Sequence, residues 1–194
     1  MKLQDRLPDG VTVDGKFYKL DLDFRNVLRM MDEMARQDLM QDAKEFRALK
    51  CLCRHPRNVQ KVLSAVYAVL FDTAPNTDTK KVTDFVQDAG LIRAAFMQSY
   101  GIDLYHDRLH WLAFRELIGA LPDGSRYREI VGIRARPMPA PTKWNGEERA
   151  WLMKAKAEVA LRIGDEEERK ERYRQDVAEV AAALLAWAEV KDGS

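Results

Sequence analysis

The stretch QSYGIDLYHDRLHWLAFRELIGALP, from Gln98 to Pro122, decides how this chain is interpreted, because it holds two of its three histidines. His106 and His110 lie four residues apart, with Asp103 and Asp107 beside them. Histidines at positions i and i+4 project from one face of a helix, as metal-binding helices require. However, no glutamate occupies the second position of that motif, and zinc would need a third ligand from elsewhere in the chain.

The alternative interpretation places the imidazole of His110 inside a helical core. We predict a helix from about Asp103 to Leu121 that ends before Pro122, with Asp103 as its cap. At about 100° per residue, His110 falls within an apolar arc formed by Trp111, Phe114, Leu117, Ile118 and Leu121. The pattern therefore favours a core histidine that is hydrogen-bonded to a neighbouring carbonyl or carboxylate, such as that of Asp103 or Asp107. We predict no metal site, no cofactor and no catalytic residue.

The remainder of the chain indicates a mainly α protein, a multi-helix bundle with a small N-terminal β-hairpin. Asp14-Gly15 lies between two short β-prone runs in residues 11–20 and supplies the positive φ angles of a tight turn. Gly101 is expected to end one helix and Ser125 to cap another. Apolar residues recur at helical spacing in residues 24–34, 41–53, 59–70 and 85–100.

Proline divides the C-terminal part from the rest. Residues 136–146 (RPMPAPTKWNG) carry three prolines and cannot form a helix, so we predict a semi-extended linker. We therefore expect a helical body over residues 1–135 and a C-terminal helical pair over residues 147–194, which could dock on the body.

The composition argues against several classes of function. Thirty-two Lys and Arg residues balance 31 Asp and Glu residues, which leaves a formal charge of +1 and no general excess for a nucleic-acid backbone. The two cysteines, Cys51 and Cys53, form neither a disulfide framework nor a complete zinc motif, and the longest apolar run is too short for a bilayer. No nucleophile or phosphate-binding glycine motif occurs. We expect a cytoplasmic protein that is not an enzyme and binds neither nucleic acid nor membrane.

Exposed arginine and aromatic residues are the best candidates for binding a protein partner. Arg134 and Arg136 lie close in sequence to Trp144, and both residue types dominate protein-binding hot spots. Trp151 and Trp187 also lie outside the expected central core. The alternative for the tryptophans is ordinary packing of the C-terminal pair against the body.

Several segments carry a resemblance to a known protein family. YGIDL, then His110-Trp111 followed by Phe114-Arg115, resembles a family of tail-gene products of temperate siphophages. The segments DFVQDAGLIRAAFMQSYG and LPDGSRYREIVGIRARPMP and the Asp23-Phe24-Arg25 opening of the first helix are similar to the same family. The resemblance covers most of residues 10–161. The motif residues expected to build the core and the corner between two helices are Tyr100, Gly101, Ile102, Asp103, His110, Trp111, Phe114 and Arg115.

The resemblance implies a function. Genes of that family lie between those of the major tail protein and the tape-measure protein, where tail assembly chaperones are encoded. It therefore implies a protein of the host bacterial cytoplasm that binds the tape-measure protein transiently, helps to recruit major tail (tube) protein, and leaves before the virion is complete. Self-association is a further possibility. The rival hypotheses are a structural tail or connector component, a small metal-dependent enzyme built on His106 and His110, and a DNA-binding phage regulator that uses the basic segment.

Overall fold

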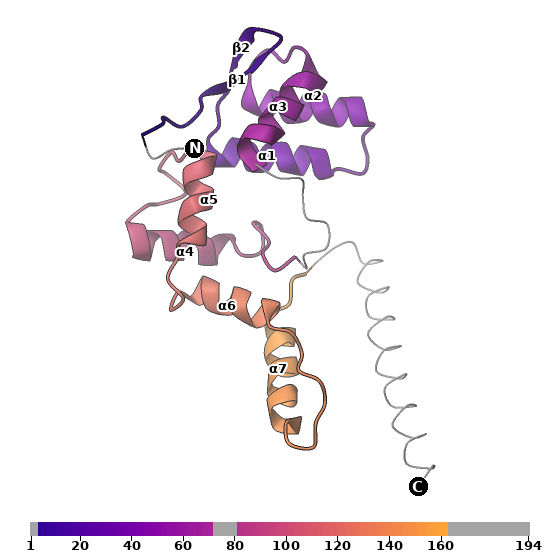
Figure 1. The fold of residues 1–194 in the computed structure, drawn as a ribbon, viewed down its shortest axis with the longest axis vertical. Helices are drawn as coiled ribbons and strands as arrows, with labels where there is room; N and C mark the ends of the chain where they lie inside the picture. Colours follow the sequence, from indigo (N-terminus) through magenta and orange to yellow (C-terminus); the bar gives the residue numbers. More distant parts are fainter. Residues whose placement is uncertain (1–3, 72–80, 163–194) are drawn as a thin grey trace. The chain divides into compact units, whose positions relative to one another are not determined.

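The computed structural model describes residues 4–71 and 81–162, which form a mainly α-helical protein with one small sheet (Figure 1). The chain divides into two compact units, Met1–Arg136 and Pro137–Ser194. No helix within the described residues is long and apolar enough to cross a membrane. The predicted fold class is confirmed.

The predicted N-terminal hairpin is confirmed. Strands β1 (Gly10–Val13) and β2 (Lys16–Lys19) pair in antiparallel fashion, with Val13 opposite Lys16. Asp14 and Gly15 have φ angles of 50° and 74°, as a two-residue turn of this kind requires. Val11 and Val13 are buried, and β1 packs against helix α3, so the hairpin is supported by a helix.

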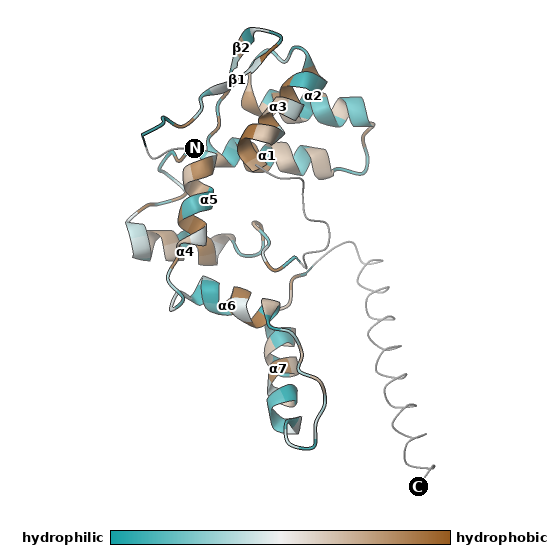
Figure 2. Ribbon diagram, in the orientation of Figure 1, coloured by the Kyte–Doolittle hydropathy of each residue, from teal (hydrophilic) through white to brown (hydrophobic). Residues whose placement is uncertain are grey.

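Three helices follow the hairpin, and each turns an apolar stripe inward. Helix α1 (Phe24–Ala35) packs closely against α2 (Gln41–Leu52), and α2 also contacts α3 (Val59–Phe71). Figure 2 shows hydrophobic residues concentrated along α3. The buried residues of that helix recur every three or four positions, at Val62, Leu63, Val66 and Leu70.

The second half of the first unit contains α4 (Ala89–Tyr100), α5 (Trp111–Gly119) and α6 (Arg126–Ala135). Gly101 ends α4 in the left-handed conformation, with a φ of 68°, and the Ser125 side chain accepts a hydrogen bond from the Arg128 backbone N–H. Both predicted helix signals are therefore confirmed.

The predicted start of the histidine-containing helix is wrong. Helix α5 begins at Trp111, not near Asp103, and residues 104–106 form a turn. The Asp107 carboxylate accepts a hydrogen bond from the Asp103 N–H, while the Asp103 carbonyl accepts one from the Asp107 N–H. These bonds make a single turn over residues 103–107, which does not continue into α5 because the Trp111 N–H donates to the Leu22 carbonyl. His106 and His110 consequently do not share a helix face.

Aromatic rings form the centre of this unit. The ring of Phe114 stacks on Phe24 with centroids 4.7 Å apart and on Phe96 with centroids 5.4 Å apart. Trp111 contacts Phe114 on one side and Phe71 on another. Rings from α1, α3, α4 and α5 therefore meet at one place, which is the predicted role of Trp111 and Phe114.

The second unit is described over residues 137–162. Residues 137–145 form no helix or strand, and α7 (Gly146–Glu158) follows them. The Asn145 side chain accepts a hydrogen bond from the Thr142 N–H and donates one to the Ala140 carbonyl, and Arg149 donates one to the Pro139 carbonyl. The second helix predicted for the C-terminal pair, including Trp187, lies outside the described residues.

Replacing Phe114 with alanine should lower the free energy of unfolding by about 3–5 kcal/mol, because it leaves a cavity between four aromatic rings. Urea denaturation followed by circular dichroism measures this loss. Phe46→Ala on α2 is the matched control, because Phe46 is 45% exposed, and it should cost far less. Equal losses in the two variants would contradict a core centred on Phe114.

Candidate functional site

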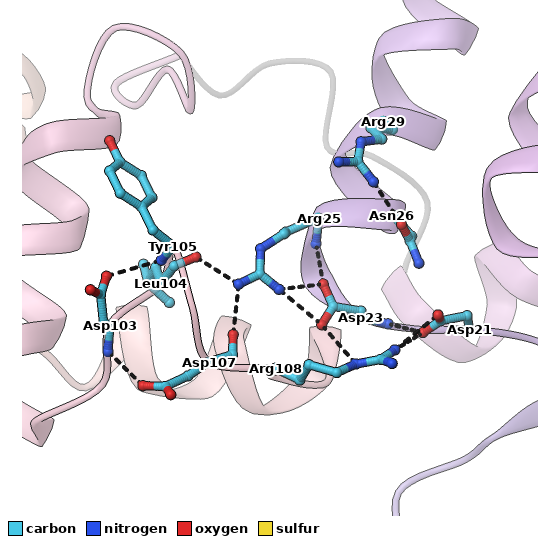
Figure 3. Close-up of polar contacts among 10 residues, drawn as sticks. All are labelled: Asp21, Asp23, Arg25, Asn26, Arg29, Asp103, Leu104, Tyr105, Asp107 and Arg108. Atoms are coloured by element: carbon cyan, nitrogen blue, oxygen red, sulfur yellow. Dashed lines mark hydrogen bonds and ion pairs between the residues drawn. The ribbon is translucent and has the colours of Figure 1, made fainter.

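Arg25, in the first turn of α1, is the centre of a polar network that joins distant segments (Figure 3). Its Nη1 donates to both carboxylate oxygens of Asp23, each at 3.3 Å. Its Nη2 donates to the carbonyls of Leu104 at 2.9 Å and Asp107 at 2.7 Å. Asp23 also caps α1 by accepting from the Arg25 backbone N–H. One guanidinium therefore fixes the start of α1 against residues 104–107.

A backbone bridge reinforces this junction. The Phe24 N–H donates to the Leu109 carbonyl at 2.9 Å, and the Trp111 N–H donates to the Leu22 carbonyl at 2.8 Å. The bridge is antiparallel and pairs Asp23 with His110. Because it satisfies backbone groups at the start of both α1 and α5, it fixes where the two helices begin relative to one another.

His110 has a structural role. It is the N-cap residue of α5, where its Nδ1 accepts a hydrogen bond from the Leu112 N–H at 3.1 Å. Its Nε2 therefore carries the proton and donates to the Pro8 carbonyl at 2.9 Å. We predicted a carbonyl or carboxylate partner; the structure assigns the carbonyl of Pro8, from the segment before the hairpin, rather than Asp103 or Asp107.

The Asp103 carboxylate has three hydrogen-bonding partners, which are Arg93, Tyr105 and His106. Arg93 on α4 donates Nε and Nη2 to its two oxygens at 2.8 and 2.9 Å, and the Tyr105 N–H donates at 3.0 Å. The exposed His106 ring lies 2.9 Å away. The Arg93 bonds, followed by the Tyr105 N–H and His106, hold the pKa of the Asp103 carboxyl well below its usual range. The predicted role of Asp103 as a helix cap is wrong, although it does build the corner after α4.

An apolar pocket of about 260 Å³ lies beside this network. Arg25 and Leu28 of α1, Ala89 and Arg93 of α4, and Tyr105 line its edge. The remaining lining residues are Phe24, Phe85, Ile92, Leu104 and Phe114. The pocket thus lies between the start of α1, the start of α4 and the turn after α4.

The other predicted motif residues also support the fold. The Tyr100 hydroxyl donates to the Leu117 carbonyl at 2.8 Å, and Arg115 donates to the Leu70 carbonyl at 2.8 Å. Ile102 is half-buried and packs against the core. These contacts attach α5 to its neighbours α4 and α3.

The predicted partner-binding residues lie in different environments. Arg134 is buried, so it belongs to no exposed surface: its guanidinium pairs with Asp88 at 2.7 and 2.9 Å and donates to the Val82 carbonyl. Arg136 is exposed. Trp144 and Trp151 are 88% and 55% exposed.

The sequence did not single out Asp88 or Arg93 as functional, because only the fold brings each to its partner.

The described part of the chain contains no cluster of side chains that forms a metal-binding site. No three His, Cys, Asp or Glu side chains within residues 4–71 and 81–162 lie where they could hold an ion together. Cys51 and Cys53 are free thiols, and burial raises the pKa of both. Because the thiolate is the reactive form, the raised pKa makes these cysteines poor nucleophiles at neutral pH.

Asp103 should make folding stability depend on acidity. Because its folded-state pKa is lowered, its contribution is complete above the ordinary aspartate pKa of about 3.9 and is lost as pH falls from there through the folded-state pKa. In urea titrations at pH 7 and pH 3, Asp103→Asn should destabilise the protein at pH 7 and less at pH 3, where the contribution is partly lost because pH 3 lies between the ordinary and the lowered pKa. Glu116→Gln, at an exposed carboxylate, is the control; a loss for Asp103→Asn that is the same at both pH values would contradict the assignment.

Arg134→Ala should cost roughly 3–5 kcal/mol of unfolding free energy, because it leaves the buried Asp88 carboxylate without its guanidinium. Arg126→Ala is a control on the same helix: it breaks an exposed pair with Glu129 and should cost less than about 1 kcal/mol. Thermal and chemical denaturation of both variants measure the difference. Similar losses in the two variants would show that the buried pair contributes no more to stability than the exposed pair.

Comparison with known proteins identifies the family. No match was found among curated proteins or among solved structures. A family model described as Bacteriophage Gp15 protein matches residues 3–161, a range that includes the Arg25 network, the pocket and α7. The predicted resemblance to a bacteriophage family is confirmed at that level. Because the match spans well over half of the 194 residues, this chain belongs to the Bacteriophage Gp15 protein family.

Proposed function

We propose that this bacteriophage protein is a tail assembly chaperone. It binds the tape-measure protein transiently, keeps that long helical chain from aggregating, and helps to bring in tail-tube subunits before it leaves. The sequence resemblance described above implies this role, and family membership over residues 3–161 supports the phage setting. The observation that carries the proposal is the exposure of three large apolar side chains on α7 and the segment before it.

These side chains are of the types that bind protein partners. Trp144 is 88% exposed, Trp151 is 55% exposed and Met153 is 57% exposed, all within ten residues of one another. Tryptophan and methionine are enriched at protein interfaces, and tryptophan dominates their hot spots. A chaperone for an amphipathic helix needs exposed apolar side chains of this kind, because they replace the packing that the partner lacks.

The polar network favours binding over chemistry. Asp23 caps α1, His110 caps α5, and Asp103 is held ionised by Arg93. Each of these groups already hydrogen-bonds to a fixed backbone group or to a charged side chain. A general acid or base needs instead a group that reaches substrate and exchanges a proton near neutral pH. We therefore assign the Arg25 network a structural role within the first unit.

The direct test is co-expression of the tagged protein with the tape-measure protein encoded by the same phage. The chaperone should increase the soluble yield of the tape-measure protein and co-purify with it. Mass spectrometry of purified virions should detect the tape measure but not this protein. Failure to co-purify would contradict the proposal, and stoichiometric amounts in virions would identify a structural tail component instead.

A further inference from the structure

We infer that the apolar pocket between α1, α4 and Tyr105 receives one large apolar side chain from an acidic amphipathic helix of the partner. The inference rests on the proposed function and adds the place and the chemistry of the contact. The partner helix would insert an aliphatic or aromatic residue into the pocket and present carboxylates to its edge.

The shape and walls of the pocket suit a side chain. Its volume of about 260 Å³ is below the range of roughly 300–1,000 Å³ that holds most small-molecule ligands. Ile92, Phe96 and Phe114 are buried in this region, and Ile92 and Phe114 reach the pocket. Phe85 and Leu28 are half-buried at its edge. An apolar anchor would therefore meet mostly aromatic and aliphatic surface, with Arg25 and Arg93 at the edge, as in helix-in-groove recognition.

Arg93 is the charged group at the edge that can receive a carboxylate of the partner, because both Nη atoms of Arg25 already donate to Asp23 and to two carbonyls. The charged residues that line the pocket are Arg25 and Arg93, and no carboxylate lines it. Asp103 pairs with Nε and Nη2 of Arg93, and Nη1 is not part of that pair. The Arg93 guanidinium also lies 4.3 Å from the centre of the Tyr105 ring. An arginine held in this manner presents a fixed positive group to an incoming carboxylate.

The edge of the pocket is preorganised. Arg25 is held by Asp23 and by the Leu104 and Asp107 carbonyls, and Arg93 is held by Asp103. Tyr105 remains 63% exposed, although the Arg93 guanidinium lies over one face of its ring. Little side-chain freedom would be lost at the arginines on binding, so more of the contact energy would appear as affinity.

Other depressions in the same unit are less suited to an apolar anchor. The larger one, of about 540 Å³, lies between the hairpin turn and α2, where Asp14, Asp42, Glu45 and Lys61 are among its lining residues. Another depression of about 260 Å³ contains Asp23 and His110, but Asp9, Asp21 and Arg108 also line it. The apolar pocket brings together Phe24, Phe85 and Leu104, from three segments that carry the family resemblance and are far apart in sequence.

The experiment uses the full chain and the tape-measure protein of the same phage as the probe. Ala89→Phe fills the pocket from α4, and Tyr105→Ala removes its exposed wall. Their matched controls are Ala94→Phe, at an exposed position of the same helix, and Tyr67→Ala, at an exposed tyrosine on α3. Circular dichroism establishes that each variant folds. If Ala89→Phe does not fold, Tyr105→Ala decides the outcome.

Both pocket variants should bind at least about tenfold more weakly in quantitative pull-down or interferometry, as expected when a buried anchor is lost. The controls should remain within about twofold of wild type, and added salt should weaken wild-type binding. Wild-type affinity in the pocket variants, with loss only in Trp144→Ala/Trp151→Ala, would overturn the pocket and leave the proposed function intact. If the pocket variants differed from wild type in oligomeric mass, a second copy of this protein would be the occupant of the pocket. That result would also overturn the inference. Absence of wild-type binding would overturn the proposed function, and the pocket inference with it.

Discussion

The junction between residues 22–24 and residues 109–111 determines how the first unit is assembled. Two backbone hydrogen bonds set the register, and Arg25 adds bonds to the Leu104 and Asp107 carbonyls. Because α1 and α5 both begin at this junction, the ring of Phe24 is brought 4.7 Å from that of Phe114. The aromatic core thus depends on polar contacts at its edge. If the junction opened, the buried backbone groups at both helix starts would lose their partners.

Features set by a few neighbouring residues could be predicted from the sequence. Asp14-Gly15 determines the hairpin because few other residues accept two successive positive φ angles. Gly101 ends α4 for a similar reason, and Ser125 caps α6 with its own hydroxyl. In each case the deciding chemistry lies within about four residues, so no knowledge of the fold is needed.

Features set by distant residues could not be predicted. Apolar periodicity placed His110 inside a helix, but Asp103 and Asp107 bond each other's backbone and the Leu22 carbonyl captures the Trp111 N–H. A helix through this stretch would sacrifice the Trp111–Leu22 bond, because the Trp111 N–H would then donate to the Asp107 carbonyl. Arg134 was expected at the surface because arginine is rarely buried without a partner, and its partner Asp88 lies 46 residues earlier. The sequence indicated a neighbouring carbonyl or carboxylate as the partner of the His110 imidazole, such as that of Asp103 or Asp107, and nothing local indicates Pro8.

The pocket and the core share residues, and this sharing limits how binding can change without loss of the fold. Phe24, Ile92 and Phe114 line the pocket from inside, and each is buried in the core. Replacing any of them alters packing as well as the pocket. Leu28, Ala89 and Tyr105 lie at the edge, where side chains are half-buried or exposed. If the pocket receives a partner helix as proposed, its specificity can vary at the edge, while the inner wall and the arginines stay fixed by the need to fold.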